Sequence, residues 1–252
     1  MKKTIFITGA TSGFGKAIAE IFAKNGNNII ITGRRQERLA SLTKELSSKY
    51  GVNILPLCFD VRVRKEVEAA ISSLPKEFRA IDVLVNNAGL ASGFGKIQDG
   101  VLEDWEKMID TNLKGLLFVS KAIFPIMISN KKGHIINIGS TAGKEVYQGG
   151  NVYCASKHAV DAISKAMRID LFEYGIKVTQ ICPGAAETEF SEVRFHGNKE
   201  QAKQVYNGYQ PMTAEDIASI AYYVTTLPEN LCINDLVVTS LAQANSYYID
   251  RK

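Results

Sequence analysis

Residues 4–22 read Thr4-Ile-Phe-Ile-Thr-Gly-Ala-Thr-Ser-Gly-Phe-Gly-Lys-Ala-Ile-Ala-Glu-Ile-Phe22 and combine a strand pattern, a turn and a helix pattern. The apolar run Thr4–Thr8 predicts a buried strand, and the apolar residues from Ala17 onward recur at helical spacing. Glycines in the turn let a backbone approach a pyrophosphate at the N-terminus of the next helix. An ordinary strand-to-helix turn is the alternative. We expect a dinucleotide site formed by Gly9, Thr11, Ser12, Gly13, Phe14 and Gly15.

The same alternation of apolar strand and helical pattern recurs at least six times along the chain. It predicts an α/β fold of the Rossmann type, a doubly wound parallel sheet with right-handed crossovers. No Pro-, Gly- or Ser-rich linker interrupts the sequence, so residues 1–252 are expected to form a single domain. The further strands are expected at Asn28–Thr32, Asn53–Phe59, Ile81–Asn86, Gly133–Gly139, Gly175–Cys182 and Ile233–Val238.

The composition restricts the location and partners of the protein. The net charge is +4, but lysines and arginines are mixed with acids along the chain, which argues against nucleic-acid binding. The apolar stretch after Met1 is too short for a signal peptide, and no segment is expected to span a membrane. These features predict a cytoplasmic protein that acts on a small molecule.

The cysteines and histidines show no metal-ligand spacing, so no metal is expected. The four cysteines fall in predicted strands or helices, which indicates buried thiols in a reducing compartment. The three histidines are far apart and are interpreted as structural or surface residues. These residues are Cys58, Cys154, Cys182 and Cys232, with His134, His158 and His196.

Two adjacent arginines, Arg34 and Arg35, follow the second predicted strand. An NAD site usually has an acidic residue at this strand end, whereas arginines accommodate the 2′-phosphate of NADP. The alternative is a basic cap on the next helix. The pair favours NADP as the cofactor, and we expect a preference of about tenfold or more over NAD.

A candidate catalytic set lies between residues 139 and 157, where Gly139-Ser-Thr-Ala-Gly143 is followed by Asn151-Val-Tyr-Cys-Ala-Ser-Lys157. Tyr153 and Lys157 are four residues apart and would share one helix face. A cation about 5 Å from a phenol, at an effective dielectric of about 20, stabilises the phenolate by roughly 3 kcal/mol. Lys157 is therefore expected to lower the pKa of Tyr153. Ser140 follows an apolar run and would lie at the carboxyl end of a strand, where α/β sheets bind ligands.

Together these motifs resemble the short-chain dehydrogenase/reductase family over essentially the whole chain. The resemblance implies an NADP-dependent oxidoreductase in which Ser140 binds the substrate oxygen, Tyr153 transfers a proton and Lys157 also binds the nicotinamide ribose. It assigns adenine contacts to Asp60 and Val61, although Asp60 could instead cap the next helix. Further cofactor contacts fall on Asn87, Ala88, Gly89, Pro183, Gly184 and Thr188, although Asn87 could merely tie down the sheet.

Asn112 lies within a long helical pattern, residues 101–129, although asparagine is a poor helix former. In the family, an asparagine here accompanies a local break in the helix and a water that extends the proton path from the active lysine. An exposed asparagine with no role is the alternative.

Two other classes fit the sequence less well. A serine hydrolase using Ser140 lacks the Gly-x-Ser-x-Gly elbow and a convincing histidine partner. A non-catalytic NADP sensor would be expected to lose the tyrosine or the lysine, and both are present.

The polar, irregular segment around residues 188–210 is the best candidate for a substrate lid. Its sequence resembles the branch of the family that oxidises serine, allo-threonine and other short 3-hydroxy acids. Arg194 is the cation proposed to bind the substrate carboxylate, together with contacts from Ser140 and Tyr153. A salt bridge from Arg194 to Glu189 or Glu192 is the alternative, and neutral ketones, sterols or acyl thioesters are the alternative substrates.

Two long apolar helical patterns, around residues 101–129 and 153–174, carry more hydrophobic positions than one sheet face covers. With the family resemblance, they predict a homotetramer. The tail from Gln243 to Lys252 has no pattern that predicts a role.

Overall fold

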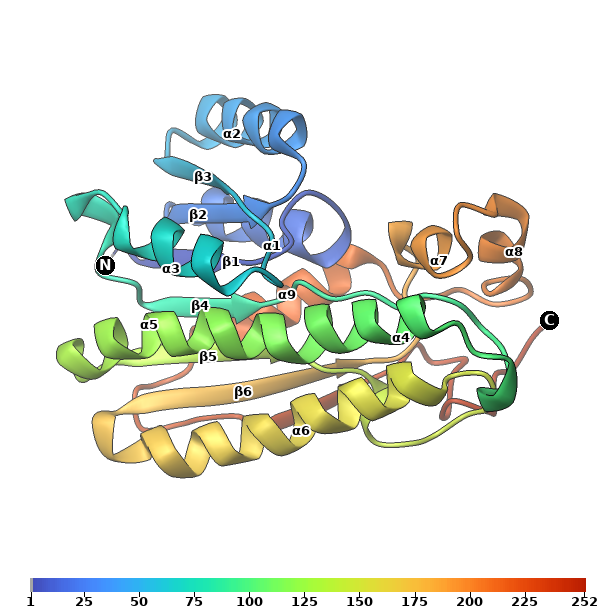
Figure 1. Cartoon of the computed structure of the whole chain (residues 1–252). Helices are drawn as coiled ribbons and strands as arrows, with labels where there is room; N and C mark the ends of the chain where they lie inside the picture. Colours follow the sequence, from blue (N-terminus) through green and yellow to red (C-terminus); the bar gives the residue numbers. More distant parts are fainter. Residues whose placement is uncertain (1) are drawn as a thin grey trace.

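The computed structural model describes residues 2–252 and contains one seven-stranded sheet in which every pair of neighbouring strands is parallel (Figure 1). The strand order is β3-β2-β1-β4-β5-β6-β7, so the direction of winding reverses between β1 and β4. A ligand crevice is expected outside the carboxyl ends of the strands at such a reversal. The predicted fold class is confirmed. The strands are β1 (Thr4–Ile7), β2 (Asn28–Gly33), β3 (Ile54–Cys58), β4 (Val83–Asn86), β5 (Gly133–Ile138), β6 (Ile176–Pro183) and β7 (Asp235–Val238).

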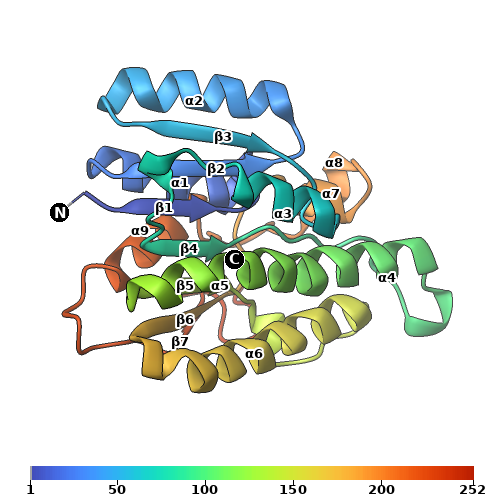
Figure 2. The same cartoon turned by 60° about the vertical axis from the view of Figure 1, so that its left-hand side comes forward.

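Two hydrophobic cores cover the two faces of the sheet, because successive strand residues point to opposite faces. In β1, Ile5 and Ile7 pack in one core with α1 (Gly13–Lys24), α2 (Gln36–Tyr50) and α9 (Ala214–Val224). Phe6 packs in the other core with α3 (Arg64–Ser72), α5 (Leu116–Asn130) and α6 (Asn151–Leu171). In Figure 2, α5 and α6 lie in front of the sheet and α1 and α9 behind it. Both faces are therefore buried, as a parallel sheet requires.

The helix predicted over residues 101–129 is continuous but not regular. It consists of α4 (Leu102–Ile109), a π-helical segment (Asp110–Gly115) and α5. Asn112 lies in the π-helical segment, so the predicted local break is confirmed. Asn112 of this segment hydrogen bonds to Leu90, which follows β4.

The expectation that no segment could span a membrane needs correction, because Leu102–Asn130 is long and apolar enough by length and composition alone. Its mean hydropathy reaches 1.3 over an 18-residue window. However, Val119, Ile123 and Met127 are fully buried against the sheet. This packing is that of the core helix of a globular domain.

The segment expected to be irregular contains two short helices, α7 (Glu189–Arg194) and α8 (Lys199–Gln204). Their N-termini are capped by Thr188, whose Oγ1 accepts from Phe190 N, and by Asn198, whose Oδ1 accepts from Gln201 N. Side-chain caps of this kind stabilise helices whose own hydrophobic pattern is weak. In Figure 1, α7 and α8 lie beyond the carboxyl ends of the strands, on the same side as the C-terminus.

The prediction of four buried thiols is half wrong. Cys154 and Cys182 are buried, whereas Cys58 and Cys232 are exposed. Cys58 ends β3, an edge strand of the sheet, and Cys232 lies in the loop before β7. Apolar neighbours in the sequence do not reveal that a strand lies at a sheet edge.

Candidate active site

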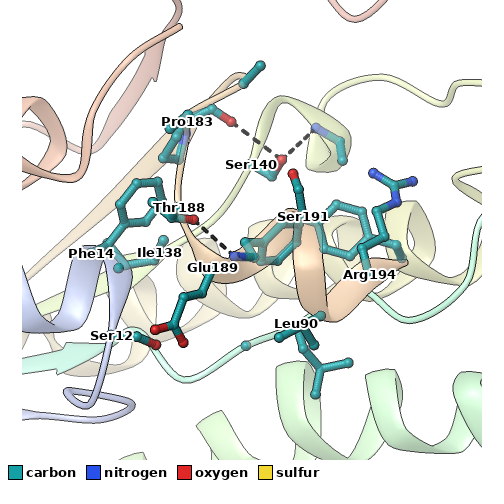
Figure 3. A pocket seen from close by; sticks show the side chains of 18 of the residues that line it. Ser12, Phe14, Leu90, Ile138, Ser140, Pro183, Thr188, Glu189, Ser191 and Arg194 are labelled. Atoms are coloured by element: carbon teal, nitrogen blue, oxygen red, sulfur yellow. Dashed lines mark hydrogen bonds between the residues drawn. The ribbon is translucent and has the colours of Figure 1, made fainter. Parts of the chain in front are cut away.

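A cavity of about 830 Å³ opens at the carboxyl edge of the sheet, and segments from the whole length of the chain line it (Figure 3). All of the predicted site residues line this cavity except Gly15 and Asn112. Figure 3 shows Ser12 and Phe14 of the first turn, Ser140 after β5, and Thr188, Glu189 and Arg194 of α7 and its N-cap around the same space.

The glycine turn has the shape that a close backbone approach requires. Gly9 has φ +66° and Gly13 φ +51°, which favour glycine. A Cβ on Gly15 would lie 2.3 Å from Gly9 O, so no side chain fits there. Asn87 Nδ2 donates to Thr8 O at 2.8 Å and to Gly9 O at 3.2 Å, so Asn87 does tie this turn to β4. The turn is thus held open at the N-terminus of α1, where an anion is favoured.

The two arginines after β2 are already oriented by polar neighbours. Arg35 donates from Nη2 to Thr11 Oγ1 at 2.7 Å and to Ser12 Oγ at 2.8 Å. Its Nη1 lies 3.1 Å from Glu189 Oε2, and Glu189 also pairs with Arg38. The guanidinium is therefore fixed beside the glycine turn rather than free in solution.

Asp60 lines the cavity beside Arg34. Burial alone would raise its pKa, but hydrogen bonds from Arg62 outweigh burial and hold the pKa below its usual value. Arg34 Nη1 lies 3.7 Å from the same carboxylate. The N-cap residue of α3 is Val63, so the alternative that Asp60 caps this helix is wrong.

The Ser140, Tyr153 and Lys157 side chains come together through two elements. Ser140 follows β5, accepts from Ala142 N at 3.1 Å and donates to Pro183 O at 3.4 Å. Tyr153 and Lys157 are both buried on α6, and Lys157 Nζ donates to Ile138 O at 2.8 Å. The last residue of β5 therefore orients the lysine, and the serine lies two residues after the end of this strand.

The ionisation of this set differs from the expectation. Burial raises the pKa of Tyr153 well above its usual value, the nearby Tyr147 raises it further, and Ser140 and Arg194 only partly oppose the rise. Burial lowers the pKa of Lys157 to about 8. The expectation that Lys157 lowers the pKa of Tyr153 is therefore wrong for the chain's own groups, because burial of the phenol dominates and Lys157 is not among the groups that shift this pKa.

Asn112 is 2% exposed and fully hydrogen bonded, so the alternative of an exposed asparagine is wrong. Its Oδ1 accepts from Leu90 N and its Nδ2 donates to Leu90 O, both at 2.8 Å, and to Ser156 Oγ at 3.0 Å. A Cβ on Gly89 would lie 3.2 Å from Asn112 Oδ1 and 3.6 Å from Lys157 Nζ. Asn112 thus lies behind Gly89, on the side of Lys157.

Arg194 reaches the cavity from the end of α7. Its guanidinium carbon lies 4.7 Å from the Phe94 ring centre, 5.5 Å from that of Tyr147 and 5.7 Å from that of Tyr153. Its Nε and Nη2 are buried and have no hydrogen-bond partner among the described residues 2–252. The alternative of a salt bridge to Glu189 or Glu192 is wrong, because Glu189 pairs with Arg35 and Arg38, and no such bridge to Glu192 exists in the described part of the chain.

The C-terminal tail contributes to the site, although no sequence pattern predicted this role. Gln243 is buried, and its Oε1 accepts from Ala185 N at 2.8 Å, next to Gly184. Arg251 Nη2 donates to Val205 O at 3.1 Å, at the end of α8. Ser246 and Ile249 also line the cavity. These contacts join segments about 50 residues apart in the sequence, which no local pattern reports.

The fold and the site define a nucleotide-dependent oxidoreductase, with a glycine turn on one side of the cavity and a serine, tyrosine and lysine on the other. The chain belongs to the short-chain dehydrogenase family, whose model matches residues 3–199.

Relatives resemble the chain over nearly its whole length. An NADP-dependent 3-hydroxy acid dehydrogenase of Schizosaccharomyces pombe is 44% identical over 99% of this chain and 97% of its own. Sulfoacetaldehyde reductase 2 of Chromohalobacter salexigens is 44% identical over 100% of both chains. The solved closed form of a serine dehydrogenase complexed with NADP+ superposes with a TM-score of 0.92, at 43% identity, and covers 99% of both chains.

Proposed function

We propose that this protein is an NADP-dependent dehydrogenase that transfers a hydride between nicotinamide and a short 3-hydroxy acid such as serine, allo-threonine or 3-hydroxybutyrate. The observation that carries the proposal is the Arg194 guanidinium, held next to Tyr153 with two buried donors that find no partner within residues 2–252. Leaving such donors unpaired in a folded protein is costly, and a carboxylate satisfies them with charge-assisted bonds. The names of the relatives support the same substrate class.

The cavity fits the cofactor by its own geometry. The turn around Gly9, Gly13 and Gly15 would hold the pyrophosphate, because a side chain is sterically excluded at Gly15 and disfavoured by positive φ at Gly9 and Gly13. Arg34 and Arg35 would bind the 2′-phosphate through their guanidinium groups. Asp60 and Val61 would contact adenine, Asn87, Ala88 and Gly89 the ribose, and Pro183, Gly184 and Thr188 the nicotinamide. When bound, NADP supplies the hydride donor or acceptor at C4 of its nicotinamide ring.

We propose that the chain's own residues handle the proton. Because Tyr153 is held neutral by burial, it is a proton donor to a substrate oxygen, and Ser140 Oγ donates a second hydrogen bond to that oxygen. Lys157 would replace the proton, since a pKa of about 8 lets it give up a proton near neutral pH. Asn112 would fix Leu90 and Gly89 next to the lysine. In the oxidative direction the same groups take up the proton in reverse order.

A comparison of an acid and an alcohol tests the substrate assignment. Arg194→Met keeps a long side chain that packs on aromatic rings but removes the charge. The variant is expected to lose at least about tenfold in kcat/KM on 3-hydroxybutyrate or serine, equivalent to about 1.4 kcal/mol, and little on an uncharged alcohol of equal size. Equal losses on the acid and the alcohol would exclude a carboxylate site at Arg194.

A short sulfonated aldehyde is the second candidate substrate. The same two donors of Arg194 could bind a sulfonate, and one relative is named a sulfoacetaldehyde reductase. Reduction of sulfoacetaldehyde, compared with oxidation of serine and 3-hydroxybutyrate, distinguishes the two. The substrate class is the one whose member has the higher kcat/KM and loses that kcat/KM in Arg194→Met.

We propose that residues 188–210 act as a lid over this cavity and that the protein is a homotetramer of the cytoplasm. Ile169 and Phe172, at the end of α6, are 70% and 72% exposed, although both are apolar. Association through α5 and α6 would cover them. The exposed free thiols of Cys58 and Cys232 suit a reducing compartment. Light scattering should find a species four times 27.7 kDa, and a monomer would contradict the assembly.

A further inference from the structure

The end of the lid that carries Arg194 is attached to a loop on the other side of the cavity. Gly93 N donates to Arg194 O at 3.0 Å. The rings of Phe94 and Phe195 meet edge to face, with centres 6.1 Å apart. Phe94 also lies under the Arg194 guanidinium. The loop around Gly93 and the end of α7 therefore form one seam.

A buried carboxylate lies beneath this seam. Asp104 of α4 is 8% exposed. Its Oδ1 accepts from Ser92 Oγ at 2.6 Å, and its Oδ2 lies 3.2 Å from His196 Nε2. A buried carboxylate needs such partners, because an unpaired one is strongly destabilising. A Cβ on Gly93 would lie only 3.0 Å from Asp104 Oδ2, so glycine allows this approach.

The backbone of His196 is itself unusual. His196 has φ +51°, one of only two non-glycine residues with positive φ in the described range 2–252, and it directly precedes Gly197 with φ +86°. A side chain in this left-handed region is disfavoured and persists when surrounding contacts determine it. The backbone here closes the end of α7, because His196 N donates to Val193 O and Gly197 N to Glu192 O, and the contact with Asp104 holds the imidazole over the seam.

We propose that Asp104 and His196 form a latch that fixes the end of the lid and thereby positions Arg194 for the anionic group of the substrate. This inference rests on the proposed function, since Arg194 is the group being positioned. Arg194 lines both the main cavity and a second cavity of about 270 Å³, which Asp104 and His196 also line. The arginine therefore separates two spaces. Without the latch, its side chain can turn toward the second cavity and away from Tyr153.

The first test uses three latch variants and one control. His196→Asn removes the imidazole and keeps a residue that tolerates positive φ, and Asp104→Asn removes the charge and keeps the shape. The double variant combines them. Lys199→Ala is the control, because this exposed residue on α8 lies three positions from His196.

Each latch variant is expected to raise KM for the preferred anionic substrate at least fivefold, with kcat within twofold and with an uncharged alcohol unaffected. The double variant should have a KM no higher than that of the more affected single variant, because both changes break the same contact. Additive losses, or a fall in kcat with unchanged KM, would overturn the proposal.

Hydrogen–deuterium exchange of residues 189–197 separates the latch from the proposed function. Exchange should increase at least fivefold in both single variants and remain native-like in Lys199→Ala. If Arg194→Met loses kcat/KM equally on the acid and the alcohol, the proposed anion site is wrong. Hydrogen–deuterium exchange then still tests the contact between Asp104 and His196. Native-like exchange in His196→Asn and Asp104→Asn would overturn the latch, whatever Arg194→Met does.

Discussion

Lys157 is placed where its charge destabilises the fold, so its removal should stabilise the protein. The side chain is 6% exposed, and burial lowers its pKa from 10.5 to about 8. At about 1.4 kcal/mol per pKa unit, the protonated lysine costs the native state roughly 3 kcal/mol at pH 7. Removal of the lysine also removes its hydrogen bond to Ile138 O, and this loss offsets the gain in stability by about 1 kcal/mol. Lys157→Met is thus expected to be about 2 kcal/mol more stable, while it loses turnover.

The pH dependence provides a second readout of the same effect. Because the folded-state pKa lies below the unfolded value, the unfolded chain binds more protons between pH 8 and 10.5. The contribution of Lys157 to stability therefore rises with pH through this window, and Lys157→Met should lack that rise. Urea unfolding at pH 7 and pH 9, without added cofactor, measures both effects.

The matched control for this experiment is Lys165→Met, an exposed lysine on the same helix whose ion pair with Asp161 is worth about 0.5 kcal/mol or less. It should change stability little and leave turnover intact. A Lys157→Met protein that is less stable than the native one at pH 7 would refute the reasoning, because burial of the charge would then carry no net cost.

Three further predictions concern other residues. Tyr153→Phe removes one oxygen and little volume, and it should lose several orders of magnitude in turnover while fluorescence titration shows that NADP still binds; retained turnover would falsify the assignment. Replacement of Arg34 and Arg35 with glutamine should erase most of an NADP preference of about tenfold or more in kcat/KM, and equal use of NAD by the native enzyme would contradict it. Burial lowers the pKa of His134 to about 4, so between pH 6.5 and 4 the unfolded chain binds more protons than the native one. The free energy of unfolding should therefore decrease by up to about 3 kcal/mol as the pH falls from 6.5 to 4. His134→Gln should flatten this fall, as urea unfolding at pH 4.5 and pH 7 would measure.

The parts of the site that sequence predicts are those fixed by local order. The strand, glycine turn and helix of residues 4–22 are contiguous, and Tyr153 and Lys157 share one helix face by spacing alone. Parallel strands place all their carboxyl ends at one edge, so the position of Ser140 after β5 already puts it near the first turn. These elements need no knowledge of distant contacts.

The parts that sequence misses depend on contacts between distant segments. Gln243 joins the loop after β6 only because the tail folds back over it. The competition between burial and charge at Tyr153 and Lys157 depends on how deeply α6 packs, which spacing does not reveal. Exposure of Cys58 follows from the position of β3 at the sheet edge. In each case the tertiary surroundings decide the property.

The π-helical segment between α4 and α5 sets the rotation of one helix relative to the other. Each residue turns a helix by about 100°, and a wider turn accommodates an additional residue without ending the helix. Removal of one residue from Asp110–Gly115 would restore a regular helix and rotate α4 by about that angle relative to α5. Asp104 would then point away from Ser92 and His196. The deletion would act on Asp104 even though it lies about two helical turns before Asn112. One irregular turn therefore sets the position of Asn112 behind the cavity and of Asp104 under the end of α7 at the same time.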